Sequence, residues 1–261
     1  MDRKVAIINV GVNRSHWNKG LISPLFDDGT YEYLPIPEEG YGEYRDCPNL
    51  KTYAELFKGK KNILDIIPEK WHDVRTHHDP EFETYTYGDS PDSPEGRVRG
   101  RALKELKEKG ALLFFFCRLT KTEGGEGRPY FFGFFEIESC QPGVKESSSE
   151  LLHIYGKNAH ILKGEADPRY FDGFWVWKGS DNSKQFEHPV RFDRELTRQI
   201  IRDKDGMEIN WPLDDTPEFR IWQGLHTRPC KLIEKDDGKK ALLRKVLEAH
   251  NEIPLFQQLL R

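Results

Sequence analysis

The sequence has few cysteines, and none of them stand in a paired spacing. The four are Cys47, Cys117, Cys140 and Cys230, and no two of them form a C-x-x-C motif. This spacing argues against a zinc ribbon and against a dithiol redox site. Cys117 and Cys140 lie in apolar, strand-like runs, where a buried free thiol is the expected state.

Long apolar segments are also missing. No run in the sequence approaches the roughly 20 apolar residues that a membrane-spanning helix requires. The first apolar run, Val5 to Val10, is too short for the core of a signal peptide. We therefore expect a cytoplasmic protein with no membrane partner, and a reducing compartment agrees with unpaired cysteines.

The chain has no excess of positive charge. Its 40 Lys and Arg residues stand against 44 Asp and Glu residues, which gives a formal net charge of -4. A protein that coats nucleic acid by neutralising phosphates is normally strongly basic. This balance disfavours non-specific DNA coating, so any nucleic-acid contact must come from a local basic patch or involve a single nucleotide or flipped base.

The common catalytic and nucleotide-binding motifs are absent. The sequence contains no G-x-x-x-x-G-K-[ST] loop, no G-x-G-x-x-G after a strand, no H-x-E with C-x-x-C and no G-x-S-x-G elbow. Gly124, Gly125 and Gly127 stand between two apolar runs without a following helix, so they do not form a phosphate cradle. From the sequence we predict no cofactor.

Apolar residues are plentiful enough for a sizeable core. Hydrophobic residues make up 36% of the 261 residues, and aromatic residues make up 12%. No internal repeat, low-complexity tract or long linker divides the chain. We expect a single domain over residues 1–261, with a helical C-terminal extension from about residue 216 to residue 261.

Hydrophobic periodicity predicts both helices and strands. The predicted strands are at residues 4–10, 31–34, 111–117, 130–137, 151–155 and 174–178. The predicted helices are at residues 51–58, 97–109, 193–202, 216–222 and 239–249, and residues 60–96 are expected to be mostly irregular. The fold class that follows is α+β with a mixed or antiparallel sheet.

The segment from Arg97 to Ile137 combines a helix, a glycine stop at Gly110, an apolar strand, a glycine-containing loop and a second apolar strand. It resembles the core of PUA-like domains of the EVE and YTH group, in which the second strand carries a small residue, here Gly133. The resemblance implies a PUA-like barrel that holds one modified or flipped base in an aromatic pocket. Ala111 departs from the usual Asp of that pattern, and an ordinary buried hairpin after a helix is the alternative.

A broader resemblance follows from the order of short motifs along the chain. These are Gly11-Val12-Asn13, Ser23-Pro24-Leu25, Asp28-Gly29, Leu34-Pro35-Ile36-Pro37, His77-His78-Asp79-Pro80-Glu81, the strands at 110–118 and 132–137, and Trp211-Pro212. In this order they resemble the third of the families called nucleotide-modification-associated domains. Arg14 replaces a usual Ser, and His78 replaces an apolar residue. The resemblance spans about residues 5–215 and implies association with altered bases.

A polar loop directly after the first strand is a candidate ligand-binding segment. It contains Asn13, Arg14, Ser15 and Lys19, which have the amide, hydroxyl and cationic groups that hold a phosphate or a base edge. Ser23 in the Ser-Pro-apolar step is a further candidate. The alternative is a solvated loop in which Asn and Ser cap turns.

The densest titratable cluster is His77, His78, Asp79 and Glu81. Side chains of an extended segment alternate in direction, so His77 and Asp79 would face the same side and form an acid-base pair. A metal ion would need a third ligand from elsewhere, such as His160 or His188, and from the sequence we predict none. The alternative is a turn at Asp79 and a histidine within a buried polar network.

Further binding candidates follow the later strands. Asn158 and His160 come after Gly156, where Asn reads base edges and His stacks or donates, unless the segment is simply a polar turn. Arg118 needs an anionic partner, either a phosphate or Glu136 across the sheet. Trp175 and Trp177 lie on one face of a strand and form either a wall for base stacking or part of the core.

Together these features suggest a protein of a nucleic-acid base-modification system, with DNA or a nucleotide as its partner, that binds a modified or modifiable base. Two alternatives stay open. One is an enzyme that acts on a base or nucleotide with a His/Asp acid-base pair. The other is a non-catalytic scaffold that contacts other proteins of a modification complex.

Overall fold

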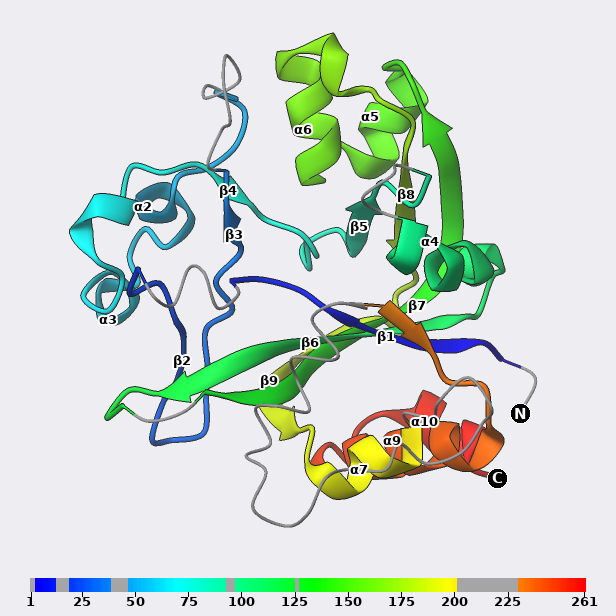
Figure 1. The fold of residues 1–261 in the computed structure, drawn as a ribbon. Coiled ribbons are helices and arrows are strands. Elements are labelled where there is room, and N and C mark those ends of the chain that lie inside the picture. Colours follow the sequence, from blue (N-terminus) through cyan, green and yellow to red (C-terminus); the bar gives the residue numbers. More distant parts are fainter. Residues whose placement is uncertain (1–2, 13–18, 39–46, 93–96, 125–126, 201–229) are drawn as a thin grey trace.

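The computed structural model describes residues 3–12, 19–38, 47–92, 97–124, 127–200 and 230–261. Its centre is a mixed sheet of eight strands (Figure 1). The main path of the sheet runs through β10 (Cys230–Leu232), β1 (Val5–Asn9), β6 (Leu112–Lys121), β7 (Arg128–Val144), β8 (Phe174–Gly179) and β5 (Thr86–Asp89). In addition, β2 (Ser23–Leu25) pairs with β6, and β9 (Lys184–Arg191) pairs with β7.

The strand pairings confirm the α+β class with a mixed sheet. Strand β6 pairs in parallel with β1 and β2, and the other pairs of this sheet are antiparallel. The path runs from β10 at one edge to β5 at the other, and no pairing among the described strands closes it into a barrel. The expected PUA-like barrel is therefore not confirmed.

Most of β6 and residues 131–137 of β7 are buried on both faces, as their nearly continuous apolar sequence predicts. Phe114 and Phe134 face one side and pack against the layer of α7 (Arg194–Ile200), α9 (Asp236–Ala249) and α10 (Pro254–Leu259). Figure 1 shows these three helices together below the sheet. Phe115 and Phe135 face the opposite side, where they join a second apolar cluster that includes Leu103 of α4 (Arg97–Lys104).

Gly133 of β7 controls how a segment outside the sheet packs onto it. A Cβ atom at this position would lie 2.6 Å from the Phe82 ring and 2.7 Å from the Lys184 carbonyl oxygen. Because Gly133 has no side chain, Phe82 packs edge-on against Phe115, Phe132 and Phe135. This packing fixes the position of the chain that precedes Phe82, which contains His77, His78 and Asp79.

A smaller lobe joins this segment to the N-terminal part of the chain. It comprises α2 (Tyr53–Leu56), α3 (Lys61–Leu64), the 3-10 turn η1 (Glu69–Trp71) and a two-stranded sheet of β3 (Ile36–Pro37) and β4 (Thr76–His77). Helix α2 begins with a capping box, because Thr52 accepts a hydrogen bond from the Glu55 amide and Glu55 accepts one from the Thr52 amide.

Two short helices follow β7 in the chain, and the hydrophobic periodicity of the sequence predicts neither of them. Residues 151–155, predicted as a strand, belong to α5 (Ser149–Tyr155), which Ser148 caps. Leu151 and Tyr155 are four residues apart and bury one helical face. Helix α6 (Ala159–Ala166) and the turn η3 (Pro168–Tyr170) follow.

Other predicted elements differ in extent. Residues 31–34 make only an isolated bridge at Tyr31, and the irregular stretch predicted at 60–96 contains α3, η1, β4 and β5. The helix predicted at 97–109 continues after α4 only as a 3-10 turn, η2 (Glu105–Lys107), before Gly110 takes a φ of 86°. The helix predicted at 216–222 lies outside the described residues. Within the described part of the chain, no helix is both long and apolar enough to span a membrane.

Candidate functional site

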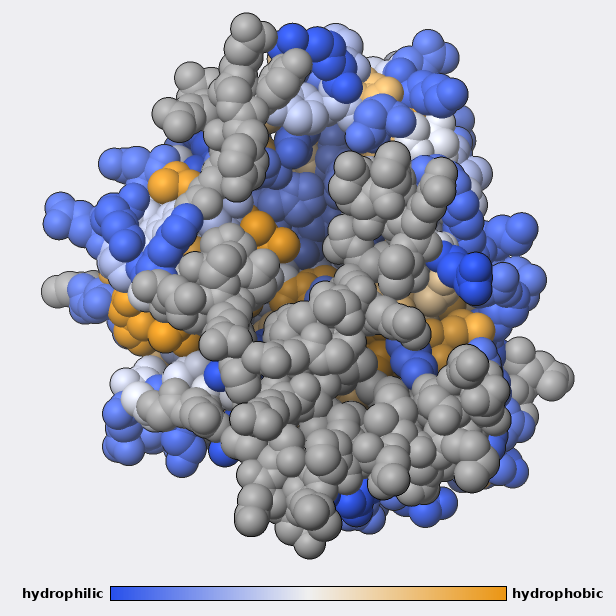
Figure 2. Space-filling model, viewed as in Figure 1, coloured by the Kyte–Doolittle hydropathy of each residue, from blue (hydrophilic) through white to orange (hydrophobic). Residues whose placement is uncertain are grey.

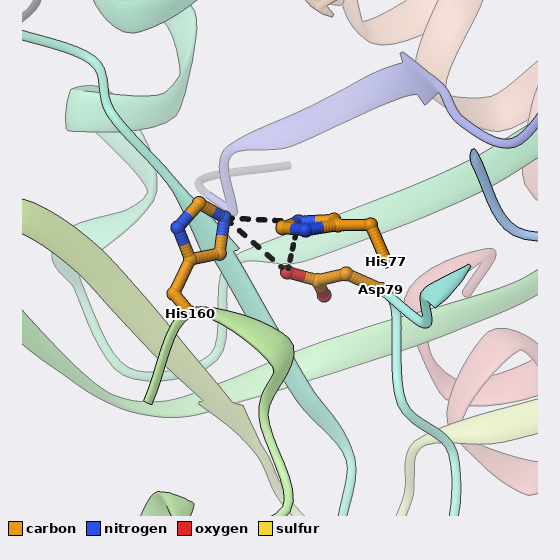
Figure 3. Close-up of side chains that lie close together, drawn as sticks. All are labelled: His77, Asp79 and His160. Carbon is orange, nitrogen blue, oxygen red and sulfur yellow. Dashed lines mark hydrogen bonds and ion pairs between the residues drawn. The ribbon is translucent and has the colours of Figure 1, made fainter. Parts of the chain in front are cut away.

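Three side chains from two distant segments converge beside the sheet. His77 ends β4, Asp79 follows two residues later, and His160 lies in the first turn of α6. The Nε2 atoms of His77 and His160 are 3.2 Å apart. Asp79 Oδ2 lies 3.9 Å from His77 Nε2 and 3.8 Å from His160 Nε2. Figure 3 shows the three side chains pointing toward one another, and we call them the His-Asp-His cluster.

Asn158 joins the two segments and is completely buried. Its side-chain oxygen accepts a hydrogen bond from the His160 amide at 3.0 Å, so it is the N-cap of α6. Its side-chain nitrogen donates to Asp79 Oδ2 at 3.4 Å. One residue therefore starts the helix that carries His160 and also holds Asp79.

Gly88 of β5 allows the cluster to approach the edge of the sheet. Its amide donates to Asp79 Oδ2 at 2.7 Å. A Cβ atom at this position would overlap the His160 ring and lie 2.9 Å from the side-chain oxygen of Asn158. Only glycine leaves space for both the imidazole and this hydrogen bond.

The Asp79 carboxyl group is buried, and its residue is only 5% exposed. Burial raises the pKa of Asp79 well above its usual value, and the hydrogen bonds from Gly88 and Asn158 only partly oppose this effect. Its second oxygen, Oδ1, has no hydrogen-bond partner among the described residues. The Tyr33 hydroxyl holds the same residue by donating to the Asp79 carbonyl oxygen at 2.7 Å.

Glu38 supports the outer side of the cluster. Its Oε1 lies 2.7 Å from His77 Nδ1 and 2.9 Å from Lys163 Nζ. Burial alone would raise the pKa of Glu38, but the hydrogen bonds and positive charges of His77 and Lys163 outweigh burial and lower this pKa to about 2. Glu38 is thus an anion that orients the His77 ring.

His78 points the other way, as alternation along the chain predicts, and lines a pocket of about 300 Å³. One wall consists of residues around β4 and the chain after it, and the other comes from the start of α6. The lining residues are Asn49, Leu50, Lys51, Thr76, His78, Glu81, Glu83, Gly156, Lys157, Ala159 and Leu162. Burial lowers the pKa of His78 to about 4. Figure 2 shows a hydrophilic recess in the area where Figure 1 places β4 and α6.

The comparison with known families gives a match over most of the chain. A model of the family described as nucleotide modification associated domain 3 matches residues 4–226. The chain belongs to this family. The match begins with β1 and ends before α9 and α10, in agreement with the resemblance inferred from the order of motifs. Searches of curated proteins and of solved structures found no match.

In this member of the nucleotide modification associated domain 3 family, the predicted site residues fall into three groups. His77, Asp79, Asn158 and His160 are brought together, and His78 lies on the adjoining pocket. Asn13, Arg14 and Ser15 lie outside the described residues. The remaining candidates are elsewhere in the fold: Lys19, Ser23, Arg118, Trp175 and Trp177.

The structure gives each of the remaining candidates a different environment. Lys19 is exposed and its ammonium lies 5.6 Å from the centre of the Trp71 ring. Ser23 is buried, and its hydroxyl accepts a hydrogen bond from the Leu34 amide at 3.1 Å. Arg118 lies in β6 opposite Pro129, away from Glu136. Glu136 instead pairs with Arg3, so the suggested Arg118–Glu136 pair is wrong.

The two tryptophans pack at the sheet. Trp177 is fully buried in the apolar core, and the centre of its ring lies 5.9 Å from that of Trp175. Trp175 is partly buried and donates from Nε1 to Asp92 at 3.0 Å. Neither residue lines the His78 pocket, so the structure agrees with the core-packing alternative for Trp177.

Glu38, Lys163 and Gly88 are site residues that the sequence does not mark, and the sequence favours the interpretation of the segment around Asn158 as a strand-end loop. That interpretation is wrong because residues 149–155 are helical and Asn158 caps the next helix. Lys163 follows His160 by three residues, so both lie on the same side of α6. His188, the other suggested ligand, lies in β9, where its carbonyl oxygen bonds to His250 at 2.9 Å.

Proposed function

We propose that this protein binds a modified or modifiable base, or its nucleotide, in the His78 pocket as part of a nucleic-acid modification system. The observation that carries the proposal is that the pocket and the His-Asp-His cluster share both of their segments. Thr76 and His78 alternate with His77 and Asp79 on one segment, and Lys157 and Ala159 alternate with Asn158 and His160 on the other. A ligand in the pocket would therefore lie beside the imidazole and carboxyl groups of the His-Asp-His cluster.

The lining of the pocket suits a flat heterocycle with a phosphate. Leu50, Ala159 and Leu162 provide apolar surface, and the His78 ring is neutral near pH 7 because burial lowers its pKa to about 4. A neutral imidazole both donates and accepts hydrogen bonds, as does the edge of a base. Lys51 is exposed at the pocket and would attract a phosphate, whereas the Lys157 ammonium is paired with the Glu83 carboxylate.

The overall charge favours a small ligand or a single-stranded one. The net charge of -4 disfavours extensive contact with a duplex backbone. The pocket also contains the Glu81 carboxylate, which would repel a continuous line of phosphates. We therefore propose a free nucleotide or one flipped base of DNA as the ligand.

An enzyme that acts on the bound base is the second candidate. The buried carboxyl group of Asp79 and the imidazoles of His77 and His160 form a concentration of reactive groups one residue away from the pocket lining. Clusters of this kind, with a strongly perturbed carboxyl group, gather at functional sites. In this candidate the cluster acts on the base and the His78 pocket holds it.

A binding screen tests the proposal. The full-length protein is tested against short single- and double-stranded DNA with unmodified and modified bases, and against free nucleotides, with mass spectrometry of the recovered ligand. We expect a salt-resistant preference for one modified base or nucleotide, weakened in His78→Ala and unchanged in His153→Ala, which removes an exposed histidine of α5. A mass change in the ligand would identify the enzyme.

Absence of any binding by the folded protein would contradict the proposal. Binding that is equal in His78→Ala and the wild type would place the ligand elsewhere on the molecule. If the folded protein binds none of these ligands, the scaffold alternative would be favoured, and the next experiment would be a search for protein partners.

A further inference from the structure

We propose that the His-Asp-His cluster is a binding site for one divalent first-row transition metal ion of the Zn²⁺ or Fe²⁺ class. The ligands are His77 Nε2, His160 Nε2 and Asp79 Oδ2. This inference comes from the side-chain geometry and does not depend on base binding in the neighbouring pocket.

The spacing of the three atoms matches the size of such an ion. Their mutual distances are 3.2, 3.8 and 3.9 Å. The circle through the three atoms has a radius of about 2.1 Å, and metal-ligand bonds of Zn²⁺ to imidazole nitrogen and carboxylate oxygen are about 2.0–2.2 Å long. An ion at the centre of the triangle is therefore within bonding distance of all three atoms without movement of the chain.

The orientation of His77 also suits a ligand. Its Nδ1 lies 2.7 Å from the Glu38 carboxylate, which is an acceptor only and therefore requires a proton on Nδ1. In the neutral ring this leaves the lone pair on Nε2, which faces the centre of the cluster. A carboxylate behind a histidine in this way fixes the tautomer of many metal-binding imidazoles and strengthens the ligand.

His160 is held in position from three sides. Its backbone amide is bonded to Asn158, its ring contacts Gly88, and the ring centre lies 5.1 Å from that of Phe174. Neither imidazole is closed off, because both side chains are 20% exposed. The ligands are thus pre-positioned, and both imidazoles are partly accessible to solvent.

Asp79 supplies the negative charge. A buried carboxylate is costly unless a cation or hydrogen bonds compensate it. Two donors reach Oδ2, while Oδ1 has no hydrogen-bond partner among the described residues. A cation at the centre of the triangle compensates the charge of a group that the protein holds away from water.

The donor set selects the metal. Two imidazoles and one carboxylate suit Zn²⁺, Fe²⁺, Co²⁺ and Ni²⁺, whereas Mg²⁺ and Ca²⁺ prefer oxygen ligands throughout. Three protein ligands leave further coordination positions for water or for a ligand oxygen, which is the arrangement of catalytic rather than structural sites. The alternative for the same geometry is a hydrogen bond between the two Nε2 atoms, which needs no metal.

Cobalt titration distinguishes these alternatives. The full-length protein is treated with a chelator, dialysed and titrated with Co²⁺ while visible absorption is recorded, and bound metal is measured by elemental mass spectrometry. We expect one Co²⁺ per chain, displacement by Zn²⁺ and no displacement by Mg²⁺. His160→Ala and Asp79→Asn should lose stoichiometric binding, whereas His153→Ala should bind as the wild type does.

A second variant tests the orientation of His77. Glu38→Gln keeps the size of the side chain but removes the charge that holds the ring, so affinity for Co²⁺ should fall about 10- to 100-fold. Circular dichroism establishes that each variant is folded. Failure of the folded wild type to bind Co²⁺ or Zn²⁺ stoichiometrically would overturn the proposal, as would full affinity in folded His160→Ala. Neither result would depend on whether the His78 pocket binds a base.

Discussion

The apolar core and the candidate site of this protein are built in opposite ways. The core centres on two strands, β6 and β7, which are close in sequence and carry continuous apolar runs. The site draws on short segments around residues 38, 77–79, 88 and 158–163, and polar contacts join them. Its parts meet only because Phe82 and Gly133 fix one segment and the N-cap at Asn158 fixes another.

Because of this difference, we expect substitutions in the core and substitutions in the site to change different properties of the protein. Loss of apolar volume in the core should reduce the free energy of unfolding without changing how the cluster is arranged. Changes around the cluster should affect ligand and metal binding more than global stability. Substitutions in each region test this separation.

The largest loss of stability is expected from Phe134→Ala. The Phe134 ring packs against Phe114, Phe186 and Phe256 and is fully buried. Removing it should lower the free energy of unfolding by about 3–5 kcal/mol, as measured by chemical denaturation. Co²⁺ affinity of the folded fraction should be unchanged. The control is Leu152→Ala, since Leu152 is 37% exposed; an equal loss in both variants would contradict the account.

Gly88→Ala should affect both the free energy of unfolding and metal binding, with the larger effect on metal binding. The new Cβ would overlap the His160 ring, so the ring or β5 must move, at an expected cost of about 1–3 kcal/mol. Co²⁺ affinity should fall because the ligand triangle opens. Gly59→Ala is the matched variant, because a Cβ there meets nothing within 4 Å although Gly59 has a φ of 87°. It should cost about 1–2 kcal/mol of backbone strain and leave metal binding intact. Wild-type affinity in Gly88→Ala would show that His160 is not held as described.

The smallest effect on the free energy of unfolding is expected from removing the charge of Glu136, a polar side chain at the margin of the core. Burial would raise the pKa of Glu136, but hydrogen bonds from Asn182, Arg3 and Ser180 lower it below 4.5. Because the pKa is lower in the folded state, the contact stabilises the protein above pH 4.5, and the contribution is lost as the pH falls through the folded-state value.

Glu136→Gln should therefore be less stable than the wild type at neutral pH, and the difference should diminish on acidification below pH 4.5. Thermal unfolding across pH measures it, with Glu138→Gln, at an exposed neighbouring position, as the control. A difference that grows as the pH falls would contradict this explanation.

The same contrast explains what the sequence could predict. The strands at residues 111–117 and 130–137 were predicted because their apolar runs are longer than any turn could accommodate, and the structure extends both. The run from Leu151 to Tyr155 is predicted as a strand, but five residues do not distinguish a buried strand from one face of a helix. Ser148 favours the helix, because its side chain caps the N-terminus of α5.

The candidate site was predictable only in part. Alternation predicts His77 and Asp79 on one side of the chain and His78 on the other; in the structure His77 lies close to Asp79, and His78 lines the adjoining pocket. His160 was suggested as a third ligand, together with His188, and only the fold distinguishes them. Glu38 and Gly88 carry no local signal, because their importance comes from contacts with residues far away in the sequence.

Crystals grown with Zn²⁺, with diffraction data collected at the zinc absorption edge, would show whether the His-Asp-His cluster binds the ion. We expect one anomalous peak within bonding distance of His77 Nε2, His160 Nε2 and Asp79 Oδ2, with Glu38 still bonded to His77 Nδ1, as the proposed metal site requires. The absence of a peak at this position, with the two imidazoles hydrogen-bonded to each other, would contradict it.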